Sequence, residues 1–198
     1  MDKYIAKHSN REVPPLEVLQ KELKRERYKR RFRRLLRSTI NALIVVAAVA
    51  ALVATLILPV LQIAGTSMEP SLNDGDIVLL IKKNDLQTGD LCSFYYSNKI
   101  LIKRVIGTPG DYIWIESDGT VFLNGEPLDE PYISEKALGE CDVEFPYQVP
   151  ENSYFVMGDH RQTSIDSRSS VIGCIAEDQI VGKIFCKFWP LSEFAFIK

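Results

Sequence analysis

The sequence predicts an all-β outer domain of about 130 residues that follows one N-terminal transmembrane helix. An uncharged, largely aliphatic run extends from Ser38 to Met68. After it, short runs rich in Val, Ile, Phe, Tyr and Trp alternate with turn signals such as Asp-Gly and Asn-Gly. No stretch beyond the aliphatic run repeats its apolar residues with the helical period of 3.6 over three turns. These observations favour a single helix before a β domain.

The aliphatic run is long enough to cross a membrane as a helix. About 20 apolar residues span the hydrocarbon core, and Ala42 to Leu58 is almost wholly aliphatic. A buried core helix and a cleaved secretory signal are the alternatives, but the apolar core of such a signal is normally only about 7–15 residues long. Pro59 lacks an amide hydrogen and is typical of a helix end. We therefore expect a membrane anchor at residues 38–61.

Charge is distributed unevenly along the chain. The first 40 residues carry 13 Lys and Arg against 5 Asp and Glu, although the whole chain has a net charge of -2. Basic residues that flank a span stay in the cytoplasm, so we expect a cytoplasmic tail at residues 1–37 and an extracytoplasmic domain at residues 62–198. Beside a span, the basic arm is expected to face lipid rather than nucleic acid. Within the tail, LEVLQKELKRERYKRRFRRLL is expected to be a helix that either touches anionic lipid or is simply solvated.

Several segments of the outer domain are expected to form strands because they combine β-branched and aromatic residues with flanking turn signals. They are DIVLLIKK, DLCSFYYS, KILIKRVIG, DYIWIES, TVFLNG, SYFVMGD and QIVGKIFCKFW. The Asp-Gly at 118–119 and the Asn-Gly at 124–125 are typical of hairpin turns. The segment ISEKALGECDVEF interrupts this pattern, and we expect it to be an exposed loop.

The four cysteines, Cys92, Cys141, Cys174 and Cys186, all follow the aliphatic run. In an oxidising space they could form two disulfides in three connectivities, whereas Cys92 and Cys186 lie in apolar strand patterns that suit buried free thiols. None makes a CxxC pair, and the chain has neither an HExxH motif nor a glycine-rich phosphate loop. We therefore expect no metal and no cofactor, and the sequence leaves the cysteine pairing open.

Ser67, in the segment AGTSMEPSLNDGD, is either a turn cap or a nucleophile close to the membrane exit. Eight residues separate it from Pro59, which is at most about 28 Å of extended chain, so Ser67 stays near the membrane surface. A nucleophilic serine needs a base, and His160 is the one histidine of the outer domain because His8 falls in the tail. Lysine is the best-attested replacement for histidine in this role.

Lys103 lies in the strand segment NKILIKRVIG. Alternation places it on the same face as Leu101 and Val105, where burial would lower the pKa of its amine from about 10.4 toward neutrality. The alternative is an exposed lysine on an edge strand, where lysine discourages aggregation. The alternation pattern alone leaves both interpretations open.

A polar cluster, GDHRQTSIDSRSSVIG, follows the apolar segment YFVM. Such a cluster is either a solvated loop closed by ion pairs or a site built at the end of a rigid strand. The cluster becomes informative when it is combined with the segments around Ser67 and Lys103.

Together these segments resemble the type I signal peptidases, in the shorter form typical of Gram-positive bacteria. GTSMEPSL is similar to the family's nucleophile box, GDIVLL to the segment after it, KRVIGTPGD to the lysine box and GDHRQTSIDSR to the last conserved box. LNGEPLDEPYI and VPENSYFVMGD are similar to the connecting segments. The resemblance covers roughly residues 38–190, anchor included, and implies the family's all-β fold of antiparallel sheets.

The resemblance also implies roles for individual residues. Ser67 would be the nucleophile and Lys103 its general base. Ser164 would hold the lysine amine by a hydrogen bond. Asp166 and Arg168 would form an ion pair that braces this wall of the site.

Asp159 and Arg161 would add structural support. The chain departs from the family's pattern at Gly65, Thr108, His160 and Thr163. In some members a serine at the position of Gly65 helps to hold the oxyanion, so here the oxyanion would rest on backbone N–H groups, that of Ser67 included. Some members use histidine in place of the lysine, and Lys103 sets this chain outside that subgroup.

The function implied by the resemblance is a membrane-bound serine endopeptidase that removes N-terminal signal peptides from exported preproteins. Its partners would be those signal peptides, bound as an added β-strand with small side chains one and three residues before the cut, the lipid bilayer and the neighbouring secretion translocon. Three alternatives remain: a self-cleaving repressor of the DNA-damage response, a hydrolase with a Ser67–His160 pair, and a membrane-tethered β domain for adhesion or assembly.

Overall fold

A computed structural model describes residues 15–57, 59–82 and 85–197 of the chain. The first 14 residues of the expected tail, His8 among them, lie outside the described residues. The chain divides into two compact units, residues 1–53 and 54–198. Each unit is described by itself.

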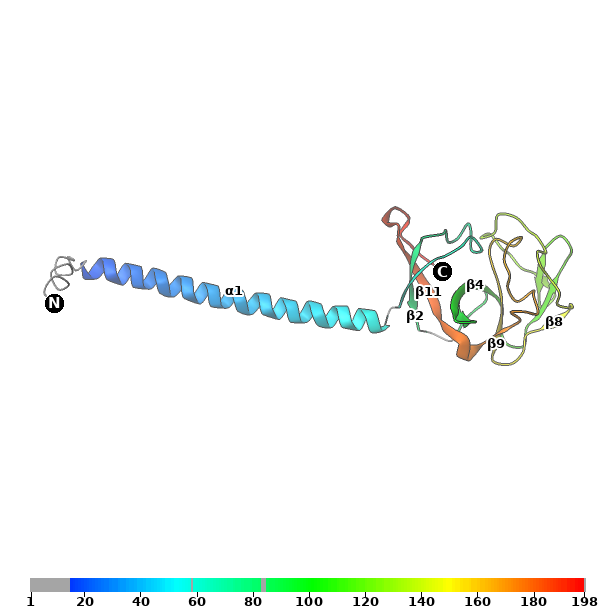
Figure 1. The fold of residues 1–198 in the computed structure, drawn as a ribbon, viewed down its shortest axis with the longest axis horizontal. Coiled ribbons are helices and arrows are strands. Elements are labelled where there is room, and N and C mark those ends of the chain that lie inside the picture. The colour runs from blue at the N-terminus through cyan, green and yellow to red at the C-terminus, as the bar shows by residue number, and fades with distance from the viewer. Residues whose placement is uncertain (1–14, 58, 83–84, 198) are drawn as a thin grey trace, which may run out of the picture. The chain divides into compact units, whose positions relative to one another are not determined.

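Helix α1 is one continuous helix over Leu16–Ile57 (Figure 1). Its 42 residues correspond to a length of about 63 Å, twice the thickness of a hydrocarbon core. Within Leu16–Val53 the helix contains an apolar stretch of 18 residues that is long enough to cross a membrane, and its side chains are exposed within the unit. The helix also includes the basic segment that precedes the aliphatic run, as expected for that segment. The basic segment and the apolar stretch that could span a membrane are therefore parts of one helix.

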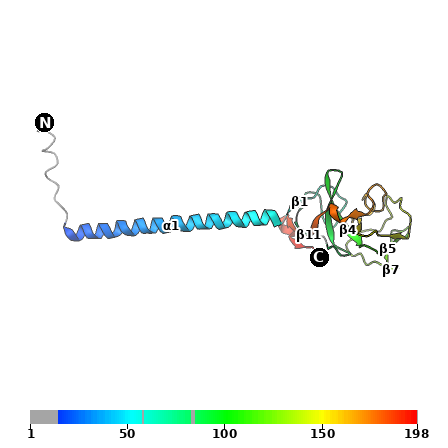
Figure 2. The ribbon, with the colours of Figure 1, turned by 90° about the horizontal axis from the view of Figure 1, so that it is seen from below.

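The second unit, residues 54–198, corresponds to the expected outer domain and is called the outer unit below. It contains two antiparallel sheets. The strands are β1 Val60–Gln62, β2 Ile77–Ile81, β3 Leu91–Tyr96, β4 Lys99–Gly107, β5 Tyr112–Ile115, β6 Val121–Leu123, β7 Glu126–Pro127, β8 Tyr147–Gln148, β9 Ser153–Met157, β10 Ile175–Ala176, β11 Ile180–Trp189 and β12 Ala195–Phe196. The larger sheet has the order β1-β2-β11-β3-β4-β9-β10, with β12 paired to β11, and the smaller has the order β7-β6-β5-β8. Figures 1 and 2 show β1, β2 and β11 at one end of the unit and β5, β7 and β8 at the other.

The fold class expected from the sequence is confirmed. Each of the seven expected segments contains a strand. Among the described residues from 59 onward, helical structure is limited to two short 3₁₀ turns, Glu177–Gln179 and Leu191–Glu193. The Asp-Gly and Asn-Gly pairs lie between antiparallel neighbours, β5–β6 and β6–β7. Asn124 and Gly125 both have positive φ, 53° and 88°, as a tight hairpin turn requires.

One boundary differs from the expected division. Val60 and Leu61 fall inside the expected anchor, yet they belong to β1 and pair with Leu79 and Val78 of β2. The helix ends at Ile57, so the paired part of the outer unit begins at Val60. The apolar run is continuous in sequence because aliphatic residues are common both in strands and in membrane helices, so composition does not mark the boundary between them.

Apolar side chains form a core that holds the strands bearing the candidate residues. One cluster contains Met68 and Leu72, from the segment after Ser67, packed with residues of β2, β3 and β11. A second contains Val105 of β4 together with Cys92 and Phe94 of β3. The core therefore fixes the segment after Ser67 and the strand that carries Lys103.

All four cysteines are free thiols in this structure. Cys92 and Cys186 are buried, as their strand patterns indicated, and burial raises the pKa of the Cys92 thiol to about 12. A buried thiol with such a pKa behaves as a small apolar side chain.

Candidate active site

The segment after β1 is a tight turn that carries Ser67. Gly65 has φ of 95°, a left-handed conformation that glycine adopts without a steric cost. Its N–H donates to Asp74 Oδ1 at 2.7 Å, and the N–H of Ile63 donates to the carbonyl of Asp76 at 2.8 Å. The NDGD segment thus binds the backbone of the turn through hydrogen bonds, while Met68 packs in the hydrophobic core. Both contacts fix the position of Ser67.

Lys103 lies in the middle of β4 opposite Cys92 of β3, and only 4% of its surface is exposed. Its Nζ donates to Ser67 Oγ at 2.7 Å. Lys103 is therefore buried, and the alternative of an exposed lysine, which the alternation pattern left open, is wrong. Two residues 36 positions apart in the chain are in direct hydrogen-bond contact.

Burial lowers the pKa of the Lys103 amine, because an ammonium loses most of its hydration there. The carboxylates of Asp166 and Asp159 oppose this effect, and the guanidinium of Arg168 adds to it. The net direction is toward a neutral amine. A neutral amine at 2.7 Å from a hydroxyl can accept its proton, which is the geometry that general-base catalysis requires.

The last polar cluster surrounds this pair. Asp166 and Arg168 are fully buried and form a two-pronged ion pair, with Arg168 Nε to Asp166 Oδ1 and Nη2 to Oδ2 both at 2.8 Å. Asp166 Oδ2 also accepts the N–H of Gly158 at 2.9 Å. The expected brace is therefore present, and it connects the two ends of the loop that follows β9.

Arg168 also holds the segment expected to be an exposed loop. Its Nη1 donates to the carbonyl of Leu138 at 2.6 Å, and its own carbonyl accepts the N–H of Asp142 at 3.1 Å. The segment is irregular, as expected, but it is fastened to the polar cluster. Gly139 with φ of 65° is required there, since a Cβ would lie 2.4 Å from the carbonyl oxygen of Arg161.

Ser164 does not make the hydrogen bond expected of it. Its Oγ is buried and has no hydrogen-bond partner among the described residues. The side chain packs against Gly158, where an added Cβ would lie 2.2 Å from Ser164 Oγ and 2.5 Å from the carbonyl oxygen of Ser67. The amine of Lys103 is directed to Ser67 instead. Ser164 thus lines the site without holding the lysine.

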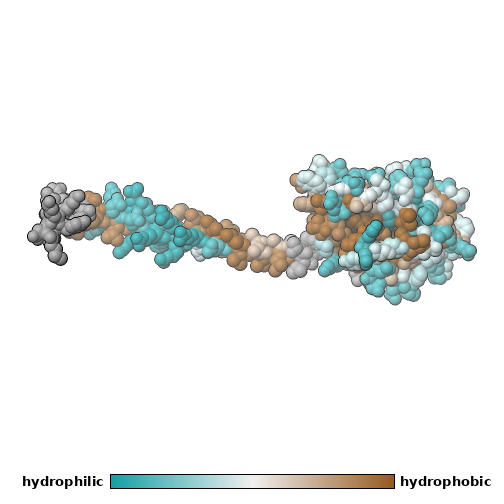
Figure 3. Space-filling model, in the orientation of Figure 1, coloured by the Kyte–Doolittle hydropathy of each residue, from teal (hydrophilic) through white to brown (hydrophobic). Residues whose placement is uncertain are grey.

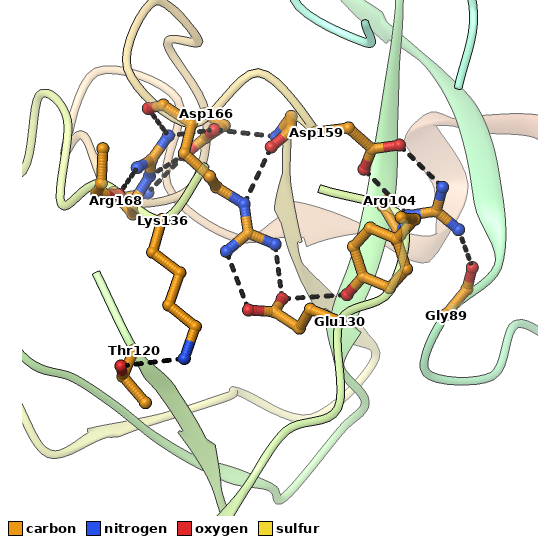
Figure 4. A network of polar contacts seen from close by, with 12 residues as sticks. Gly89, Arg104, Thr120, Glu130, Lys136, Asp159, Asp166 and Arg168 are labelled. Carbon is orange, nitrogen blue, oxygen red and sulfur yellow. Dashed lines mark hydrogen bonds and ion pairs between the residues drawn. The ribbon is translucent and has the colours of Figure 1, made fainter. Parts of the chain in front are cut away.

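Asp159 and Arg161 have partners that sequence reasoning did not identify (Figure 4). Asp159 is paired with Arg104 of β4 at 2.7 Å. Arg161 is paired with Glu130, whose carboxylate also accepts the hydroxyl of Tyr132 at 2.9 Å. The KRVIGTPGD and LNGEPLDEPYI segments contained these residues, but nothing in their spacing indicated the pairing.

His160 is not placed as a base for Ser67. Its Nδ1 lies 2.5 Å from Thr163 Oγ1, and among the described residues no hydrogen bond joins the ring to Ser67. Its backbone N–H instead donates to the Ser67 carbonyl at 3.1 Å. The contact supports the nucleophile turn, and the Ser67–His160 alternative lacks its essential hydrogen bond.

A groove passes beside the Ser67–Lys103 pair. Its walls are the segment from Leu61 to Gly65 on one side and residues 100–103 of β4 on the other. Residues 99–103 of β4 pair with β3 alone, because β9 pairs with β4 only from Arg104 onward. In the described part of the chain, the N–H of Ser67 donates to no protein acceptor. The groove therefore offers a strand edge and a free backbone donor near the nucleophile.

In this antiparallel β unit a serine hydroxyl accepts a hydrogen bond from a buried lysine amine. This arrangement is characteristic of the serine–lysine hydrolases. Residues 36–189 match the family described as "Signal peptidase, peptidase S26". A signal peptidase IB of Staphylococcus aureus is 38% identical over 154 residues, which cover 68% of this chain and 79% of that protein. A signal peptidase I of Bacillus licheniformis is 37% identical over 144 residues, covering 66% and 76%.

The chain belongs to the signal peptidase family, peptidase S26. The resemblance to the short form found in Gram-positive bacteria is thereby confirmed, and the protein is a serine peptidase. Among solved structures, a signal peptidase I from Enterococcus faecalis V583 is 28% identical, with a TM-score of 0.41, covering 50% of this chain and 96% of that one.

Proposed function

We propose that this protein cleaves N-terminal signal peptides from exported preproteins with Ser67 as nucleophile and Lys103 as general base. The observation that carries the residue assignment is the 2.7 Å contact between Lys103 Nζ and Ser67 Oγ in a buried site. Family membership supplies the reaction, since the chain is a signal peptidase of the S26 family. A repressor or an adhesion domain has no comparable support.

In the proposed cycle, neutral Lys103 takes the hydroxyl proton of Ser67 as Oγ attacks the scissile carbonyl carbon. The N–H of Ser67 donates to the oxyanion of the tetrahedral intermediate, and Gly65 contributes no side chain. The Lys103 ammonium then gives its proton to the leaving amine, which leaves an ester on Ser67. Water gives a proton to Lys103 as it attacks this ester, and the Lys103 ammonium then returns a proton to Ser67 Oγ as the signal peptide departs with a new carboxylate.

The precursor is proposed to bind as a strand in the groove beside the dyad. The free edge of β4 over residues 99–103 offers backbone hydrogen bonds, while alternate substrate side chains would point between the groove walls. Those walls include Ile63, Leu101 and Ile102, which leave apolar, narrow space. Such walls suit small side chains one and three residues before the cut.

Replacing Ser67 tests the function. With detergent-solubilised full-length protein and a model preprotein, Ser67→Ala should abolish cleavage, because within the described residues no other hydroxyl forms a hydrogen bond with the Lys103 amine. The matched variant His160→Ala keeps the backbone N–H that supports Ser67, so it should retain cleavage within about tenfold of wild type. Full processing by Ser67→Ala would contradict the peptidase assignment, and loss of cleavage in His160→Ala as complete as in Ser67→Ala would restore the Ser–His alternative.

We further propose the topology: residues 1–37 in the cytoplasm, a single span, and the outer unit beside the bilayer and the secretion translocon. The basic residues that precede the span support this orientation. Exposed aromatic side chains of β11 and β12 support contact with lipid, among them Phe188, Trp189 and Phe196. Figure 3 shows apolar surface gathered over β2 and β11.

The aromatic residues belong to the same sheet as β1, which is the first strand after α1 in the chain. Val60 pairs with Leu79, Leu79 with Cys186, and Cys186 with Phe196. The sheet that follows the helix in sequence therefore carries the exposed aromatic side chains, which supports the proposed contact with lipid.

The two tryptophans provide a matched test of membrane contact. Trp189 is 49% exposed on β11 and Trp114 is 46% exposed on β5, in the other sheet. In vesicles with brominated acyl chains, the Trp114→Phe protein, which retains Trp189, should lose at least about half of its emission. The Trp189→Phe protein, which retains Trp114, should be quenched far less. Equal quenching of the two, or none in either, would refute contact through β11.

A further inference from the structure

Glu130 occupies a central position in the polar network although it follows a strand of the smaller sheet. It lies three residues after β7, and 9% of its surface is exposed. Its carboxylate accepts both Arg161 Nη1, at 3.1 Å, and Nη2, at 2.5 Å. It also accepts the hydroxyl of Tyr132 at 2.9 Å. One carboxylate thus has two protein partners that belong to different parts of the site (Figure 4).

The first partner leads to the nucleophile. Arg161 Nε donates to the carbonyl of Gly158 at 3.0 Å, which closes the loop between them. Within that loop the N–H of His160 donates to the carbonyl of Ser67. Glu130 therefore fixes, through Arg161, the loop that supports the backbone of Ser67.

The second partner leads to the base. The ring of Tyr132 lies under the Arg104 guanidinium, 3.8 Å from the ring centroid to Cζ. Arg104 is the residue after Lys103 in β4, and it also donates to Ser71 Oγ at 3.1 Å in the turn that carries Ser67. A cation over an aromatic face is favoured electrostatically, so the Tyr132 ring limits how far this part of β4 can move.

We propose that Glu130 is a positioning residue that sets the geometry between Ser67 and Lys103. It does so by holding both the loop that supports Ser67 and the part of β4 that carries Lys103 and Arg104. The proposal rests on the proposed function, because it concerns the rate of the Ser67–Lys103 reaction. A displacement of about 1 Å at a reacting pair can cost about 10²-fold in rate. The carboxylate touches neither reacting atom, so its effect passes through Arg161 and Tyr132.

A purely structural role for Glu130 makes different predictions. The charges that act on Lys103 are those of Asp166, Arg168 and Asp159, so loss of the Glu130 charge alone leaves the electrostatics of the amine nearly unchanged. If Glu130 only stabilised the fold, its loss would reduce the folded fraction and leave the kinetics of folded molecules unaltered.

The test uses Glu130→Gln in the full-length protein, with kinetics referred to the concentration of folded enzyme. We expect kcat to fall about 10- to 100-fold with KM within about threefold of wild type. The acid limb of the kcat/KM profile should move to higher pH, since a loosened wall admits water to Lys103 and restores its hydration. The control is Asp111→Asn, another carboxylate-to-amide change, which removes the charge that binds Thr108 and Asn124 in a loop outside the network.

A second variant, Tyr132→Phe, keeps the ring under Arg104 and removes only the hydroxyl that binds Glu130. It should lower kcat by about threefold, and it decides the question if Glu130→Gln does not fold. Wild-type kcat per folded molecule in Glu130→Gln, or in Tyr132→Phe where only that variant folds, would overturn the proposal, as would an equal kcat loss in Asp111→Asn. Inactive wild-type protein would instead refute the proposed function.

Discussion

Lys103→Met is expected to lower cleavage of a preprotein by at least about 10⁴-fold without destabilising the protein. The change removes the amine that would accept the Ser67 proton, and residues of a catalytic unit lose nearly all activity when one of them is removed. Methionine has nearly the length of lysine and fits beside Leu101 and Val105. It carries no charge to desolvate in a site that is 4% exposed, so its free energy of unfolding should equal or exceed that of wild type.

The pH dependence of the free energy of unfolding and that of cleavage both follow from the lowered pKa of Lys103. Burial holds the pKa of Lys103 in the folded protein below the value of about 10.4 in the unfolded chain. Between these two values the unfolded chain binds more protons, so the free energy of unfolding decreases as the pH falls through this window. Cleavage requires the neutral amine, so kcat/KM should also decrease as the pH falls through the lowered pKa.

The two pH dependences can be measured on the same preparations. Urea unfolding at pH 7 and at pH 10 gives the change in the free energy of unfolding, and a kcat/KM profile of the wild type gives the change in cleavage. Lys103→Met should lose the contribution of this group to the stability slope and show no cleavage at any pH. A variant that unfolds at markedly lower urea than wild type, or that still cleaves with a normal acid limb, would argue against Lys103 as a buried neutral base.

The Ser67–Lys103 pair could be predicted because three segments together resemble the signal peptidases, whereas the local patterns alone left it open. Alternation in the strand placed Lys103 on the same face as Leu101 and Val105, but it did not exclude an exposed lysine. The structure shows that Lys103 is buried and that its Nζ lies 2.7 Å from Ser67 Oγ. This contact joins residues 36 positions apart, so it depends on the folded sheets rather than on neighbours in the chain.

The partners of Asp159 and Arg161 could not be predicted, because they are long-range choices among equivalent charges. Arg161 could have paired with any carboxylate of the outer domain, and its partner Glu130 is 31 residues away. Arg104 and Asp159 are 55 residues apart. Only the folded sheets bring these groups together, and no periodicity encodes which acid meets which base.

The short strands and the Ser164 side chain were beyond sequence reasoning for a different reason. Strands β7, β8, β10 and β12 have two residues each, too few for an alternation pattern. The Oγ of Ser164 is directed by its packing against Gly158, where the absence of a Cβ leaves space. A rotamer chosen by packing depends on the three-dimensional neighbour, so a family pattern alone could not place it.

Arg168→Met should be the most destabilising single change in the site, costing about 3–5 kcal/mol. Arg168 is fully buried and donates to Asp166 and to the carbonyls of Leu138 and Arg161. Its removal leaves the Asp166 carboxylate buried without its counter-ion, which is more costly than the loss of both charges. The control is Lys183→Met, which breaks a more exposed ion pair on β11 and should cost far less.

A double-mutant cycle separates the ion pair from packing. Asp166→Asn combined with Arg168→Met removes the stranded charge, while the asparagine oxygen can still accept the N–H of Gly158. The double variant should therefore be more stable than Arg168→Met alone, with a coupling of at least about 1 kcal/mol in urea unfolding. In the single variant, loss of the guanidinium also removes a charge that lowers the pKa of Lys103, so the acid limb of any remaining cleavage should move to higher pH. If the losses in free energy of unfolding are additive and the acid limb of the pH profile does not move, the Asp166–Arg168 pair contributes only to packing and does not affect the pKa of Lys103.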